Sequence, residues 1–297
     1  MITRRPDPAN FTGRDLRFRP ADPRRATTLG AAQIDAYNSN GFISSIDVFD
    51  ASEVAALRHY IDELLDEIAS AGDGRDSYSI NNDHPTLAGL WDVVTDARIV
   101  ALVGDLIGRR AVCWGSHLFA KLPGDGKSVP FHQDAVYWPF EPAKTTTVWL
   151  AIDNVGLHNA PVQFVPGSHL GGPIAHEVLE PDGTRVLERR ARGLDRFPGR
   201  HFNELRAGQV SLHSDLLLHG SDANTSPLRR AGLTLRYAAA EVRLLDGYDA
   251  WRGSAVHVLD GDSSGFWPNR PRPAAHRDGR VLTHRSGNTD AHVVDAS

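Results

Sequence analysis

Residues 128–140 read SVPFHQDAVYWPF, a run typical of a β-strand in which two side chains able to bind a metal ion stand two residues apart. Successive strand side chains point to opposite faces, so His132 and Asp134 are expected on the same face. An imidazole and a carboxylate, completed by one remote histidine, form the facial triad that suits non-heme iron(II) and leaves coordination positions open. The spacing also occurs by chance, so a surface strand pair is the alternative interpretation.

The composition is that of an ordinary globular protein, and we expect residues 1–297 to form a single domain. Hydrophobic residues make up 41% of the chain, yet no apolar run is long enough to span a bilayer, so no membrane partner is expected. A net charge of −5 with interspersed signs disfavours a nucleic-acid partner, and no obligate protein partner is evident. No signal segment follows Arg4 and Arg5, which favours a cytoplasmic location. A single cysteine, Cys113, excludes an intrachain disulfide and a thiolate metal cluster.

Helices are predicted in the first third of the chain. Residues 50–72 carry apolar side chains at helical spacing, and Asp50 and Glu53 match a capping box at their start. A second amphipathic segment, which ends at Gly108, predicts a helix that covers a sheet face. Residues 1–30 are rich in Pro, Arg, Asp and Thr without periodicity, so we expect an extended N-terminal arm.

Short apolar, β-rich runs separated by Gly, Pro and Asn follow Gly108 and predict an antiparallel sandwich or barrel. These runs lie at residues 111–121, 129–138, 145–152, 162–165, 209–218 and 231–243. Residues 170–203 form a long connection of mixed charge, and loops of that length are usually lids or binding loops, so we interpret them as a lid over the site. Residues 271–297 are expected to form a coil tail.

The remote third ligand has two candidates, His213 and His219. His219 ends an apolar run just before Gly220, where a strand reaches a rim, whereas His213 sits inside the strand, so we favour His219. Eleven residues further stands Arg230. A planar guanidinium binds a carboxylate through two parallel hydrogen bonds, so this arginine suits the far end of a dicarboxylate cosubstrate such as 2-oxoglutarate.

Several motifs stand in a fixed order: KLPG at residues 121–124, HQD at 132–134, VWLAIDN at 148–154, VPGSH at 165–169 and HGSDANTSPLRR at 219–230. With them the chain resembles the phytanoyl-CoA dioxygenase family of iron(II) and 2-oxoglutarate-dependent oxygenases. The resemblance implies a mainly β fold with flanking helices (α+β) around a double-stranded β-helix, or cupin-like jelly roll. It also implies iron(II), 2-oxoglutarate and O₂ as cofactors and cosubstrates, and a small molecule as the substrate.

Carried over by position, the resemblance makes His132, Asp134 and His219 the iron ligands and Arg230 the 2-oxoglutarate clamp, with Arg229 or Arg236 as alternatives. The other contacts it implies are Lys121, Trp149 and Ser221 for the cosubstrate and Trp138, Tyr137 and His117 for the substrate. For these softer assignments the alternatives are a lysine that reaches solvent, aromatic core packing and an outward-facing histidine.

Two positions refine the expected chemistry. Ala160 and Pro161 stand where relatives commonly carry a flexible Asn-Gly pair, which puts the geometry of that turn in doubt. Asp134 stands where halogenating relatives carry a small residue, which disfavours halogenation. We therefore expect hydroxylation of an unactivated C–H bond of a small metabolite. Desaturation, cyclisation or epimerisation at the same centre, and a non-catalytic metal-bearing module, are the alternatives.

Overall fold

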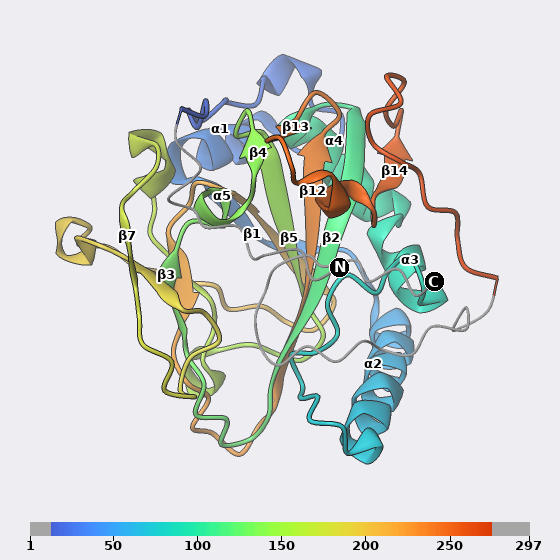
Figure 1. The fold of residues 1–297 in the computed structure, drawn as a ribbon, viewed down its shortest axis with the longest axis vertical. Coiled ribbons are helices and arrows are strands. Elements are labelled where there is room, and N and C mark those ends of the chain that lie inside the picture. Colours follow the sequence, from blue (N-terminus) through green and yellow to red (C-terminus); the bar gives the residue numbers. More distant parts are fainter. Residues whose placement is uncertain (1–12, 275–297) are drawn as a thin grey trace.

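The protein was analysed as a computed structural model that describes residues 13–274. Two antiparallel sheets form its framework, and flanking helices pack around them (Figure 1). The larger sheet has the order β1 (Phe42–Asp47), β10 (Gln209–Ser214), β5 (Thr145–Ala151), β12 (Arg230–Ala239), β2 (Arg110–Lys121) and β14 (Val256–Leu259). The smaller sheet has the order β3 (Val129–His132), β11 (His219–Ser221), β6 (Gln163–Phe164) and β9 (His201–Phe202). The mainly β jelly-roll fold expected from the sequence is confirmed.

Two short two-stranded sheets complete the strands: β13 (Arg243–Leu244) with β4 (Phe140–Glu141), and β7 (His176–Val178) with β8 (Arg189–Ala191). The helices are α1 (Ala31–Asn40), α2 (Ala51–Ala71), α3 (Ala88–Val94), α4 (Ala97–Ile107) and α5 (Asp134–Tyr137). Figure 1 shows α2, α3 and α4 on the opposite side of the larger sheet from β3 and β7. Both faces of the larger sheet are thus covered, and every residue of β5 and β12 is buried.

The two predicted helices are confirmed as α2 and α4. In α2 the Asp50 carboxylate accepts hydrogen bonds from the backbone N–H of Ser52 and Glu53, and the Glu53 carboxylate accepts one from the N–H of Asp50. The helix ends at Gly72, which adopts the left-handed conformation that glycine tolerates. Local capping signals were therefore sufficient to place this element.

The prediction of a strand over residues 129–138 is wrong for the second half of that range. The strand β3 ends at His132, and Asp134 begins the short helix α5. Gln133, between them, still has an extended backbone with φ −108° and ψ 129°, so the alternation of side chains persists through this one residue. The conclusion that His132 and Asp134 share a side survives for that reason.

Residues 170–203 differ from the structureless connection that their composition suggested. They contain the β7–β8 pair and the strand β9, which joins the edge of the smaller sheet. The N-terminal arm is described from Gly13, and the rest of it, residues 1–12, lies outside the described residues, as does most of the expected coil tail, residues 275–297.

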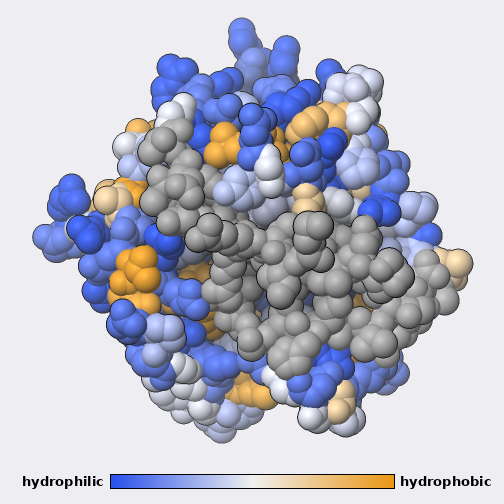
Figure 2. Space-filling model, in the orientation of Figure 1, coloured by the Kyte–Doolittle hydropathy of each residue, from blue (hydrophilic) through white to orange (hydrophobic). Residues whose placement is uncertain are grey.

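The surface view in Figure 2 is mostly hydrophilic, with apolar spots separated from one another. The large apolar side chains that are exposed lie on separate loops and short strands: Leu122, Leu157, Leu170, Val178, Phe202 and Leu228. Within residues 13–274, none of the helices combines the length and apolar character needed to cross a membrane.

Candidate metal centre and cosubstrate pocket

His132, Asp134 and His219 converge between the two sheets, and their ligand atoms all lie within 4.8 Å of one another. Antiparallel pairing of β3 with β11 places His132 directly opposite His219, with ring centroids 4.2 Å apart. All three side chains are buried. Strand register therefore assembles the cluster that spacing alone predicted only in part.

Hydrogen bonds fix which nitrogen of each imidazole faces the cluster. Nδ1 of His132 lies 2.8 Å from the carbonyl oxygen of Pro130, and Nδ1 of His219 lies 3.0 Å from that of Leu217. A carbonyl only accepts, so Nδ1 carries the proton in both rings and Nε2 keeps its lone pair for a metal ion.

The charge states also suit a metal. Burial, followed by the nearby His132, holds the pKa of His219 well below its usual range, so this ring is neutral. Burial alone would raise the pKa of Asp134, but the nearby imidazoles of His132, His213 and His219 hold it well below its usual range. Two imidazoles and one carboxylate are the donor set of a non-heme iron(II) facial triad, so the residues fit this metal.

Gln133 points away from the cluster and does not serve as a ligand. Its side-chain amide donates to the carbonyl oxygens of Gly172 and Leu216, at 3.0 and 2.7 Å, and its carbonyl accepts from the N–H of Ile174 at 2.7 Å. Because Gln133 is fully buried, the bonds with Gly172 and Ile174 fasten the start of the 170–203 segment to the end of β3, and the bond to Leu216 ties the same amide to the chain before β11.

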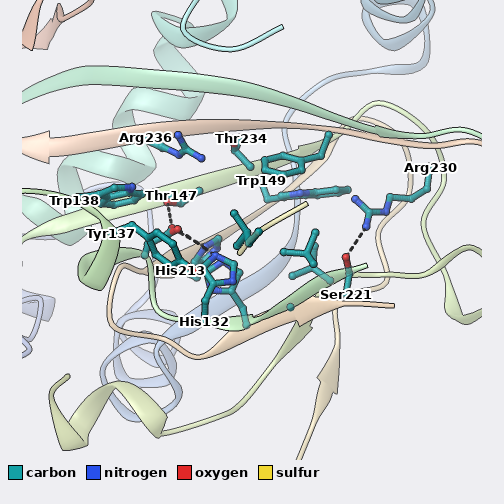
Figure 3. A pocket seen from close by; sticks show the side chains of 17 residues that line it. His132, Tyr137, Trp138, Thr147, Trp149, His213, Ser221, Arg230, Thr234 and Arg236 are labelled. Atoms are coloured by element: carbon teal, nitrogen blue, oxygen red, sulfur yellow. Dashed lines mark hydrogen bonds and ion pairs between the residues drawn. The ribbon is translucent and has the colours of Figure 1, made fainter. Parts of the chain in front are cut away.

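The cluster opens into a cavity that lies between the two sheets (Figure 3). Five of the other residues expected around the small molecules line it: Trp149, Ser221, Arg230, Tyr137 and Trp138. A cavity with a few polar groups on an apolar wall is typical of a small-molecule site.

Arg230 forms one end of the cavity. Its Nη2 donates to the Ser221 hydroxyl at 3.1 Å and its Nε to the carbonyl oxygen of Ala160 at 3.0 Å, while its guanidinium carbon lies 5.6 Å from the centroid of the Trp149 ring. Burial lowers the pKa of Arg230 to about 10, so the side chain is a cation at neutral pH. A buried, aligned guanidinium is well suited to bind a carboxylate.

The turn that lacked the expected glycine holds this arginine. Ala160 adopts the left-handed conformation, with φ +61°, and directs its carbonyl oxygen to Arg230. The sequence put the geometry of this turn in doubt because a glycine was missing. The turn has the left-handed conformation that glycine favours, and alanine adopts it instead.

The two alternative clamps occupy different environments. Arg229 is ion-paired with Asp153, at 2.8 Å from its Nε, and with Asp62, and it is not among the residues that line the cavity. Arg236 does line the cavity, with its guanidinium carbon 5.5 Å from the ring centroid of Trp138. Its position beside Ser221 therefore favours Arg230 as the carboxylate clamp. Arg236 lies at another part of the cavity wall.

Two residues expected around the site are not among the residues that line the cavity. The Lys121 ammonium donates to the carbonyl oxygens of Lys127, at 3.0 Å, and Asp222, and burial lowers the pKa of Lys121 to about 6, with Arg230 adding to the effect. His117 bonds through Nε2 to the carbonyl oxygen of Tyr78 at 2.8 Å. Their roles in binding stay predictions.

Other lining residues escaped the sequence reasoning as site residues. They are Val129, Thr147, Val162, Leu187, Gly220 and Thr234. Thr234 shares strand parity with Arg230, so alternation along β12 was a usable signal. Thr147 carried no such signal, because it meets the site only through the pairing of β5 with β10.

A jelly roll that holds two histidines and one carboxylate beside a cavity with a buried guanidinium defines the class of non-heme, metal-dependent oxygenases. The family model for phytanoyl-CoA dioxygenase (PhyH) matches residues 37–232, and the chain belongs to this family. Family and triad together make it an oxygenase that uses iron(II), 2-oxoglutarate and O₂.

Curated relatives cover most of the chain. A Stutzerimonas stutzeri protein described as a probable alpha-ketoglutarate-dependent hypophosphite dioxygenase is 27% identical over 261 residues, covering 80% of this chain and 88% of that protein. The ectoine dioxygenase of Halomonas elongata is 27% identical over 244 residues, covering 75% of this chain and 74% of that protein. The two relatives carry different substrates in their names, so they do not define one substrate.

Solved structures share the fold at lower identity. The apo form of a non-heme monooxygenase, ThoJ, aligns with a TM-score of 0.70 and 21% identity, covering 82% of this chain and 88% of that chain. SnoK, an alpha-ketoglutarate-dependent carbocyclase from nogalamycin biosynthesis, aligns with a TM-score of 0.60 and 23% identity, covering 75% and 90%. These likenesses show the jelly-roll fold.

Proposed function

We propose that this protein hydroxylates an unactivated C–H bond of a small metabolite, with 2-oxoglutarate and O₂ as cosubstrates. In balance, substrate C–H, O₂ and 2-oxoglutarate give substrate C–OH, succinate and CO₂. The observation that carries the proposal is one cavity that holds the His132, Asp134 and His219 cluster and, at one end, the guanidinium of Arg230.

The residues supply position and environment. His132, Asp134 and His219 would hold iron(II), which supplies the redox chemistry that couples decarboxylation of 2-oxoglutarate to C–H oxidation. Arg230 binds the far carboxylate of 2-oxoglutarate, and the Ser221 hydroxyl, 3.1 Å from Nη2, keeps the guanidinium in place. The buried walls exclude water from the reacting groups.

We place the substrate in the part of the cavity lined by Tyr137, Trp138 and Arg236, where the wall is aromatic with one cation. Leu187, from the 170–203 segment, also lines the cavity, and we propose that this segment covers the bound substrate. An arginine on this wall favours a substrate group that accepts hydrogen bonds, such as a carboxylate.

The proposal is tested by anaerobic reconstitution with iron(II) and 2-oxoglutarate, followed by addition of candidate metabolites. We expect a weak visible charge-transfer band, a change in that band with the right compound, and one succinate formed per hydroxylated product after O₂ is admitted. No 2-oxoglutarate consumption with any member of a broad panel would favour the non-catalytic binding module.

Product analysis separates hydroxylation from the other reactions that the same residues allow. Hydroxylation adds one oxygen atom to the substrate, desaturation and oxidative ring closure remove two hydrogen atoms, and epimerisation leaves the formula unchanged. Mass spectrometry of the product in ¹⁸O₂ therefore separates hydroxylation from the other reactions, and a product without label would overturn hydroxylation by the expected route.

A further inference from the structure

The two oxygens of the Asp134 carboxylate lie in different surroundings. Oδ1 is 3.5 Å from Nε2 of His132, on the side of the ligand cluster. Oδ2 accepts a hydrogen bond from the Thr147 hydroxyl at 3.2 Å and lies 3.8 Å from Nε2 of His213. One oxygen thus faces the other ligands, and the second faces a hydroxyl and a third imidazole.

Thr147 and His213 reach Oδ2 from the same face of the larger sheet. They stand directly opposite each other in the antiparallel pairing of β5 with β10, so their side chains emerge together. Asp134 approaches from the other wall of the cavity, at the start of α5 just beyond β3. The contact therefore joins both walls at the carboxylate.

The His213 side chain makes no hydrogen bond within residues 13–274. The side chain is 2% exposed, and neither ring nitrogen has a hydrogen-bond partner there. Its ring packs against His219, with centroids 4.7 Å apart, and against Phe164, at 5.2 Å. Leaving a buried polar group unsatisfied costs about 1–3 kcal/mol, so a ring held in this position calls for a functional explanation.

We propose that Thr147 and His213 are positioning residues that engage Oδ2 of Asp134 so that only Oδ1 is presented to the metal. A carboxylate can bind a metal through one oxygen or through both, and a second bound oxygen would occupy a coordination position that the cosubstrate needs. The inference rests on the proposed function, because it assigns the freed position to 2-oxoglutarate and O₂.

The test compares Thr147→Val and His213→Phe with the wild type and with Thr95→Val. Thr95 is not among the residues that line the cavity, its hydroxyl donates to the carbonyl oxygen of Trp91, and Thr95→Val serves as the matched control. Cobalt(II) is titrated into each metal-free protein under argon. We expect Thr147→Val and His213→Phe to bind cobalt(II) roughly 10–100-fold more weakly, the usual effect of losing a partner of a ligating group.

A second readout separates orientation of the carboxylate from general loss of structure. At saturating iron(II) and without O₂, the charge-transfer band is titrated with 2-oxoglutarate. Thr147→Val should need a higher concentration to develop the band, Thr147→Ser should restore wild-type behaviour because it keeps the hydroxyl, and the unfolding temperature of the metal-free variants should stay within a few degrees of wild type.

Each outcome is decisive. If both Thr147→Val and His213→Phe match Thr95→Val in cobalt(II) and 2-oxoglutarate affinity, the positioning role is wrong. If the wild type develops no band with iron(II) and 2-oxoglutarate, the proposed function fails, while the cobalt(II) affinities still test the engagement of Asp134 by itself.

Discussion

Arg230 and Arg236 lie on the same face of β12 and line different ends of one cavity (Figure 3). A strand advances about 3.3 Å per residue, so their backbone positions are about 20 Å apart. A single small dicarboxylate that also reaches the metal ligands cannot engage both guanidiniums. On the proposed function, Arg230 marks the cosubstrate end of the cavity and Arg236 the substrate end.

Replacing the two arginines should separate these ends kinetically. Arg230→Ala is expected to raise the 2-oxoglutarate concentration for half-maximal succinate formation by roughly 10–100-fold, since a charge-assisted hydrogen bond contributes about 1.5–3 kcal/mol. Arg236→Ala should change that concentration by less than about threefold, because Arg236 lies at the other end. The opposite ranking would move the clamp to Arg236.

Asp134 contributes the only carboxylate of the ligand cluster, so its removal should be severe. Asp134→Ala is expected to abolish substrate-dependent succinate formation and to weaken iron(II) binding by at least about a hundredfold, which equilibrium dialysis measures. Asp92→Ala, at an exposed acid paired with Arg272, is the matched control and should retain activity. Full activity of Asp134→Ala would remove this residue from the triad.

Gly232 makes room for the indole of Trp149. A Cβ atom built at Gly232 would lie 1.9 Å from Cζ2 of Trp149, so Gly232→Ala must displace the ring that packs beside Arg230. We expect a loss of about 1–3 kcal/mol in unfolding free energy and a higher 2-oxoglutarate requirement. Gly126→Ala, which meets no atom within 4 Å, should leave both unchanged. Equal behaviour of the two variants in urea unfolding and succinate assays would contradict this account.

Ala160 offers a stabilising substitution. An alanine at φ +61° costs about 1–2 kcal/mol, whereas glycine adopts this conformation freely and loses about 0.5–1 kcal/mol through chain entropy. Ala160→Gly should therefore raise the unfolding free energy by about 0.5–1 kcal/mol. The carbonyl oxygen that accepts from Arg230 is retained, so 2-oxoglutarate affinity should not change. A lower midpoint in urea would show that the turn is not strained.

His84 should make the protein sensitive to acid. The ring is fully buried between the Ser116 hydroxyl, 2.9 Å from Nδ1, and the carbonyl oxygen of Ser254, 2.8 Å from Nε2, and burial lowers the pKa of His84 to about 4. The unfolded chain, with a histidine pKa of about 6.5, binds the proton first. Stability is therefore present above pH 6.5 and falls as the pH drops from about 6.5 to 4, by about 1–3 kcal/mol.

The change His84→Gln removes that titration. Urea unfolding at several pH values between 4 and 7 should give a shallower slope of unfolding free energy for His84→Gln than for the wild type. The comparison uses slopes, so a uniform loss of stability in the variant does not affect it. Equal slopes would exclude His84 as a source of acid sensitivity.

Sequence patterns predicted best where the determining interactions are local. The capping residues Asp50 and Glu53 act within one helical turn, and α2 begins where they indicate. The pair His132 and Asp134 depends on one extended residue, Gln133, and survived the error that extended the strand beyond it. Local conformation thus carried much of the fold and two of the three proposed ligands.

Contacts that depend on strand register were not predictable from the sequence. Thr147 and His213 meet Asp134 only because β5 pairs with β10 in one register, and the spacing of residues within either strand does not encode that register. The cavity position of Leu187 likewise depends on how the 170–203 segment folds back. These long-range pairings supplied the part of the site that the motifs lacked.

The three hydrogen bonds of Gln133 have a mechanical consequence. Two of them hold Gly172 and Ile174 and the third holds Leu216, so residues 172–174 are anchored to the barrel immediately beside the two proposed ligands. If the segment opens to admit a substrate, the bending must occur beyond this anchor, toward Leu187, because the buried amide holds the base fixed. Gln133 would thus keep His132 and Asp134 in place while the 170–203 segment moves.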